Sequence, residues 1–170
     1  LIFGSTVNAA APDLRGLAED VDRNRIEADI RSLVSFGTRH TLSDTLSATR
    51  GIGAARTWVH DEFQRISRAS GGRLQVSFDF FTPDSSARVP VPRRMANVVA
   101  VLPGTSDAAR GRYYVVSGHL DSRATDIGNA EILAPGANDD ASGVAVVLEA
   151  ARVLSPVQLD ATVVFIAFAG

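Results

Sequence analysis

A histidine and three carboxylates fall in two short segments of the sequence. They are His119 and Asp121 in Ser117-Gly-His-Leu-Asp-Ser122, and Asp139 and Asp140 in Pro135-Gly-Ala-Asn-Asp-Asp-Ala-Ser-Gly143. Since the chain has no cysteine, any metal ion must be bound by histidine, aspartate or glutamate. A lone histidine or a lone Asp-Asp pair is more often structural. Occurring together and in this order, they favour a metal site.

Local geometry also suggests how one of these ligands is held. Because side chains alternate along a strand, His119 and Asp121 should share a face while Leu120 points into the core. A carboxylate two residues from a ligating histidine can accept its other ring N–H, which fixes the tautomer. We therefore expect Asp121 to orient His119.

The loop that follows is rich in acid, with Asp126, Glu131, Asp139 and Asp140 all preceding the next predicted helix. Adjacent carboxylates repel one another unless a proton or a cation lies between them, and a divalent metal ion would resolve the conflict at Asp139 and Asp140. One alternative is structural. Asp140 or Ser142 could instead cap the helix N-terminus.

The surrounding elements form a predicted strand–helix–strand unit. Residues 113–117 are a continuous apolar run, typical of a strand covered on both faces. A helix is expected over 141–154 and a buried strand over 162–169. A crossover of this length implies a parallel strand pair. Ligands of open α/β sheets bind beyond the carboxyl ends of the strands, which is where His119 and Asp121 fall.

The first half of the chain supplies further elements. A helix is expected over 24–36 with a capping box at Asn24 and Glu27, and a second from about Ile52 to the glycines at 71 and 72. Residues 74–80 alternate between apolar and polar and predict a half-buried strand. A second strand, 97–102, should lie beside it after a proline-containing loop over 82–94.

Composition limits the classes of partner. The 170 residues include 45% hydrophobic and 21% charged residues, which suits one globular domain. A net charge of −2 gives no basic surface for nucleic acid, and no apolar run is long enough to span a membrane. A small molecule or a peptide is the expected partner.

The sequence divides into a flexible N-terminus, 1–21, and a domain, 22–170. Val7-Asn-Ala9 resembles a signal-peptide cleavage site, which would make the protein secreted or periplasmic, and an ordinary terminus is an equal alternative.

Three other polar residues have simpler interpretations. His60 is expected on the surface of a helix, and His40 in a loop. Glu149 is expected to form an ion pair with Arg152 at helical spacing.

The segments 117–122 and 135–143 closely resemble the leading motifs of the M28 family of zinc-dependent peptidases, of the two-zinc aminopeptidase type. The resemblance implies an α/β three-layer sandwich with a mixed, largely parallel central sheet. It also implies that His119 binds one zinc ion, that Asp139 bridges two, that Asp121 orients His119, and that a cis peptide joins Asp139 to Asp140. The implied partner is a peptide substrate.

The family continues its last strand with a Glu-Glu pair just past the position of Gly170, one serving as general base and the other as a zinc ligand. Further ligands come later. None of these is in the sequence, so the resemblance implies the N-terminal part of a catalytic domain that needs its remainder. The implied activity is aminopeptidase hydrolysis by a zinc-activated water. The alternatives are glutaminyl cyclase or carboxypeptidase chemistry on the same scaffold, or a peptidase-like binding domain without catalysis.

Overall fold

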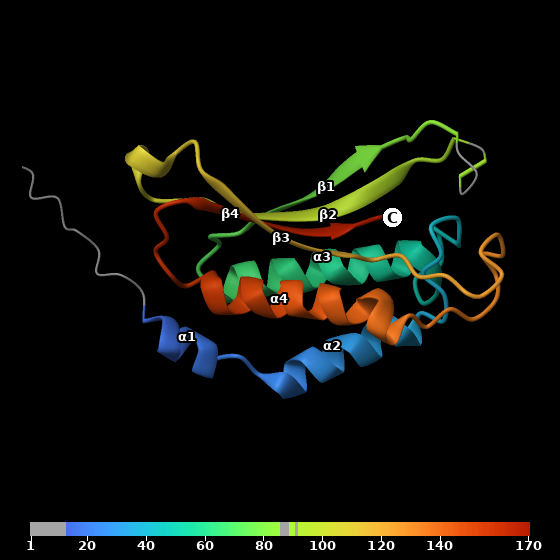
Figure 1. Ribbon diagram of the computed structural model, residues 1–170, viewed down its shortest axis with the longest axis horizontal. Helices are drawn as coiled ribbons and strands as arrows, with labels where there is room; N and C mark the ends of the chain where they lie inside the picture. The colour runs from blue at the N-terminus through green and yellow to red at the C-terminus, as the bar shows by residue number, and fades with distance from the viewer. Residues whose placement is uncertain (1–12, 86–88, 91) are drawn as a thin grey trace, which may run out of the picture.

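A four-stranded sheet with helices packed against it forms the described part of the chain, residues 13–85, 89–90 and 92–170 of a computed structural model (Figure 1). The helices are α1 (Leu14–Glu19), α2 (Arg23–Ser35), α3 (Gly51–Ala69) and α4 (Ser142–Leu154). The strands are β1 (Gln75–Phe81), β2 (Met95–Leu102), β3 (Tyr113–His119) and β4 (Thr162–Phe168). The three longer helices and all four strands lie close to their expected positions, and α1 was not predicted.

The strand order is β1-β2-β4-β3. The β3–β4 pair is parallel, as the strand–helix–strand unit predicted, and β1 and β2 are neighbours across the predicted loop. The predicted α/β class with a mixed sheet is confirmed. The sheet is less parallel than expected, because both β1–β2 and β2–β4 run antiparallel.

Helices cover one face of this sheet (Figure 1). Helix α3 contacts β1 and β2, α4 contacts β3 and β4, and α2 packs on α4 from outside. The described residues thus contribute the sheet and the helices of one side, and the opposite helical layer of the expected sandwich is not among them.

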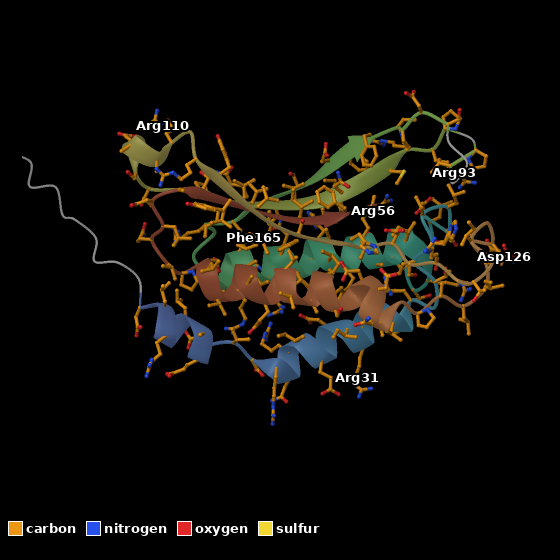
Figure 2. All side chains as sticks on the ribbon, viewed as in Figure 1. Arg31, Arg56, Arg93, Arg110, Asp126 and Phe165 are labelled. Carbon is orange, nitrogen blue, oxygen red and sulfur yellow. The ribbon has the colours of Figure 1, made fainter. Side chains whose placement is uncertain are left out.

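The core lies between the sheet and α3 and α4. Side chains from alternate positions of β2 and β4 point into it, and Phe165 of β4 is fully buried opposite Ala100 of β2 (Figure 2). A large side chain facing a small one fills the layer without a void. Burying one such phenylalanine contributes about 1.5–3 kcal/mol. On α3 the predicted apolar stripe is buried, and Gly71 and Gly72 end the helix with φ of +74° and +79°.

Strand β3 departs from its prediction. Its apolar run was expected to be covered on both faces, yet Tyr113, Tyr114 and Val115 are 63%, 56% and 59% exposed. Within the described residues β3 pairs with β4 alone and forms an edge of the sheet. An apolar run predicts that a strand is covered by apolar side chains, but it does not identify the segment that covers the strand.

The structure also differs from two expectations near the N-terminus. Helix α2 is capped by Asp22, whose carboxylate accepts the N–H of Asn24 at 2.8 Å, so the predicted Asn24 cap was wrong. Residues 14–19 of the segment expected to be flexible form α1. The proposed cleavage site at Val7-Asn-Ala9 lies outside the described residues. None of the described helices combines the length and apolar character needed to cross a bilayer.

Candidate metal centre

The two motif segments meet at one end of the sheet. His119 is the last residue of β3, and Asp139 lies in the irregular turn Ala137–Ala141 that leads into α4. Asp139 and Asp140 are joined by a cis peptide bond, as the family resemblance implied. Because β3 and β4 are parallel, the carboxyl ends of both strands lie at this end of the sheet. Gly170, which follows β4, lies there too.

The imidazole of His119 contacts a carboxylate on each side. Its Nδ1 lies 3.0 Å from Oδ1 of Asp121, and its Nε2 lies 2.9 Å from Oδ1 of Asp139. If the neutral ring donates its Nδ1 proton to Asp121, the Nε2 lone pair faces a carboxylate oxygen. Two acceptors this close require a proton or a cation between them. The site can therefore hold either an imidazolium or a shared metal ion.

The pKa of His119 reflects this surplus of negative charge. Partial burial opposes the charged imidazolium, but the carboxylates of Asp121, Asp140 and Asp139 outweigh that effect and raise the pKa above its ordinary value. Without metal, the proton is therefore retained to a higher pH than on an isolated histidine. A metal ion that takes Nε2 must displace it.

The carboxylate of Asp140 accepts two hydrogen bonds from the backbone. One carboxylate oxygen accepts the N–H of His119 at 3.0 Å, and the other accepts the N–H of Gly143 at 2.9 Å. Neither of the two predicted caps is the N-cap of α4, which is Ala141. Asp140 still binds the first turn through Gly143, whereas the Ser142 hydroxyl donates to the carbonyl of Asn138. Asp140 joins the end of β3 to the first turn of α4.

The remaining acidic residues of the loop do not reach the site. Asp126 is exposed at the loop tip, where its carboxylate accepts the N–H of Gly128 (Figure 2). Glu131 is exposed as well. Only Asp139 and Asp140 of this loop come together with His119 and Asp121.

His40, His60 and Glu149 have structural roles. His40 is buried, with Nδ1 accepting the N–H of Leu42 and Nε2 lying 3.0 Å from the carbonyl of Ile127, so it joins two loops. His60 was expected on the helix surface, but it is partly buried, because its ring stacks on Phe78 of β1 where α3 packs against that strand. The predicted Glu149–Arg152 ion pair is confirmed at 2.6 Å, and Glu149 also accepts the N–H of Asp22.

The donor set fits part of a zinc coordination sphere. Zinc in proteins binds imidazole nitrogen and carboxylate oxygen, and His119 Nε2 and Asp139 Oδ1 converge as such a pair. Within the described ranges no group of three or more potential ligands is found. The pair borders an open hollow of about 450 Å³, also lined by Asp121, Arg123, Phe168 and Gly170. A zinc ion held by this pair would leave positions open toward the hollow.

Arg39 is a residue at this site that the sequence did not reveal. Its side chain is fully buried behind the two motif segments. Its partners are backbone carbonyls, which leave no pattern in a sequence. The one available signal was an arginine two residues after Gly37, just past the end of a predicted helix, and such residues are common in loops.

Residues 97–170 match the profile of Peptidase family M28. A probable zinc metalloprotease from Pyricularia oryzae is 47% identical over 169 residues, which make up 98% of this chain and 33% of that protein. The chain spans about a third of the length of the curated relatives that it matches.

Solved structures share the fold. Glutaminyl cyclase from Porphyromonas gingivalis superposes with a TM-score of 0.64 at 20% identity, covering 88% of this chain and 46% of its own. A Zn-dependent exopeptidase from Parabacteroides distasonis gives a TM-score of 0.64 at 19% identity, covering 88% of this chain and 47% of its own. At such identity the likeness shows the fold, which both proteins have in common with this chain.

Proposed function

Since residues 97–170 match the profile of Peptidase family M28, we propose that the protein is a zinc-dependent peptidase that removes residues from the N-termini of peptides. One observation carries the proposal. His119 Nε2 and Asp139 Oδ1 face each other at 2.9 Å at the carboxyl end of a parallel strand pair, beside an open hollow. Such an arrangement lets a metal ion bind both side chains and still meet a ligand from solvent.

In this proposal each side chain has a distinct role. His119 and Asp139 would hold zinc, and Asp139 would be the ligand shared with a second ion. Asp121 accepts the Nδ1 proton of His119 and so keeps Nε2 available to the metal. Asp140 holds the backbone of His119 against α4. Zinc, when bound, polarises a peptide carbonyl and lowers the pKa of a bound water.

The general base and the remaining ligands are proposed to come from polypeptide beyond Gly170. This residue lines the same hollow as His119 and Asp139, so residues that follow it would enter the site directly. Secretion or export to the periplasm remains a prediction from Val7-Asn-Ala9.

The activity is tested with the full-length protein and chromogenic aminoacyl substrates, with and without a chelator. We expect hydrolysis that the chelator abolishes and zinc restores. Absence of chelator-sensitive hydrolysis would contradict the proposal. The same preparation should be assayed on a peptide with N-terminal glutamine and on peptides with blocked N-termini. Cyclisation of the former would replace the proposal with glutaminyl cyclase chemistry, and C-terminal trimming of the latter with carboxypeptidase action.

A further inference from the structure

We infer that Arg39 is the positioning residue of the metal centre: its buried guanidinium holds the strand end that carries His119 against the turn that carries Asp139. The inference rests on the proposed metal centre. It goes further by assigning the pre-arrangement of that centre to a residue from a different part of the chain, the loop after α2.

The guanidinium donates to backbone carbonyls of both motif segments. Nε donates to Leu120 at 2.8 Å, the residue that follows His119. Nη1 and Nη2 donate to Pro135 at 2.7 Å and Gly136 at 3.0 Å, at the start of the Asp139 segment. Nη1 also donates to Leu33 in α2 at 3.0 Å. A planar fork of five N–H donors can serve several carbonyls at once, which the ammonium of lysine cannot do in this geometry.

The backbone of Arg39 ties the same segments a second time. Its N–H donates to the hydroxyl of Ser122 at 3.0 Å, and its carbonyl accepts the N–H of Ser122 at 3.1 Å. The Ser122 hydroxyl in turn donates to the carbonyl of Ala134 at 2.6 Å. All of these groups are buried, so the loss of one leaves a polar partner without compensation.

Gly136 shows how closely the segments approach. Its φ is +48°, and a Cβ built there would lie 2.6 Å from Cβ of Ser122 and 3.0 Å from Nη2 of Arg39. A side chain at this position would separate the two segments. Glycine is therefore required where Arg39 draws them together.

Arg39 also places a positive charge behind the carboxylates. Burial lowers its pKa to about 10, against the opposing effect of Asp121 and Asp140, and it remains a cation at neutral pH. No carboxylate hydrogen-bonds to it among the described residues. Its charge thus reduces the repulsion between Asp121 and Asp140 before any metal ion binds.

Zinc titration of an Arg39→Lys variant by calorimetry tests this role. Lysine keeps the charge but loses most of the fork, and we expect the zinc affinity to fall by about 10–100-fold, the usual effect of losing a group that positions a ligand. The matched control is Arg73→Lys. Arg73 donates to the carbonyls of Ser155 and Val157 beyond the far end of α4. This control should lower the melting temperature without changing zinc affinity.

A zinc affinity of Arg39→Lys within twofold of the wild type would overturn the inference, whatever happens to its melting temperature. If the variant does not fold, hydrogen exchange of the wild type decides. We expect the amides of Ser122 and Ala134 to be equally protected with and without zinc. Rapid exchange of these amides until zinc is added would mean that the metal, and not Arg39, arranges the segments. A wild type that binds no zinc would refute the proposed metal centre. Rapid exchange of the Ser122 and Ala134 amides in the metal-free protein would even then show that Arg39 does not hold the two segments together.

Discussion

Nε2 of His119 lies 2.9 Å from Oδ1 of Asp139, although the two residues are separated by a loop and belong to different elements. The other ring nitrogen of His119 is already paired with Asp121. The contact therefore places a lone pair opposite a carboxylate unless a proton or a metal ion occupies the space between them. The proposed function depends on this relationship.

Removing either member of the pair should weaken zinc binding. We expect His119→Ala and Asp139→Asn each to reduce zinc affinity by more than about 100-fold, because even losing an outer partner of a ligand costs about 10–100-fold. Isothermal titration calorimetry measures the effect. His60→Ala, which removes a histidine stacked on Phe78 away from the site, is the control and should bind zinc as the wild type does.

Asp140 should matter for stability. Its carboxylate accepts two backbone N–H groups, and Asp140→Ala leaves both without that acceptor. We expect the free energy of unfolding to fall by about 1–3 kcal/mol in urea denaturation. Asp140→Asn retains one acceptor oxygen and should lose less. Equal losses for the two variants would show that these hydrogen bonds are not the cause.

Gly143 should not tolerate a side chain. A Cβ at this position would overlap the Asp140 carboxylate. Alanine in a helix is usually favoured over glycine by about 0.5–1 kcal/mol, but overpacking costs about 1–3 kcal/mol, so we expect Gly143→Ala to be destabilising. Gly111→Ala is the control, since nothing lies within 4 Å of a Cβ there. A more stable Gly143→Ala protein would contradict this account of the β3–α4 junction.

Asp29 on α2 should give stability a pH dependence. Desolvation and the nearby charge of Glu62 raise its pKa to about 6 from 3.8. The folded state thus binds this proton more tightly than the unfolded state, so the contribution of Asp29 to stability falls as pH rises from about 4 to 6.

Asp29→Asn should therefore raise the urea midpoint at pH 7.5, where the wild type must bury a charge, and have little effect at pH 3.5. Glu19→Gln, at the exposed end of α1, should change the midpoint at neither pH. If Asp29→Asn were destabilising at pH 7.5, the carboxylate would have a favourable partner.

Patterns of side chains allowed much of the fold to be predicted. The apolar stripe from Ile52 to Ile66 places one face of α3 against the sheet, and that periodicity is visible in the sequence. Cap selection was not predictable from the same information. Both Asp22 and Asn24 are good caps, and Glu27, expected to complete a box with Asn24, pairs instead with Arg31 at 3.0 Å.

The residues of the candidate site also differ in whether the sequence could predict them. His119, Asp121, Asp139 and Asp140 could be identified because their side chains form a pattern at the end of a predicted strand. Arg39 could not, since its guanidinium binds main-chain carbonyls whose positions depend on the folded loops. The exposure of β3 was hidden for a related reason: a sequence pattern does not indicate which strands lie at an edge.

The most direct test is a crystal structure of the zinc-soaked protein with anomalous difference maps recorded above and below the zinc absorption edge. We predict a zinc peak about 2.0–2.2 Å from both Nε2 of His119 and an oxygen of Asp139. Asp121 should still accept the Nδ1 proton. Zinc bound elsewhere, or no peak between these two side chains at full zinc occupancy in solution, would contradict the assignment of His119 and Asp139 as the metal ligands.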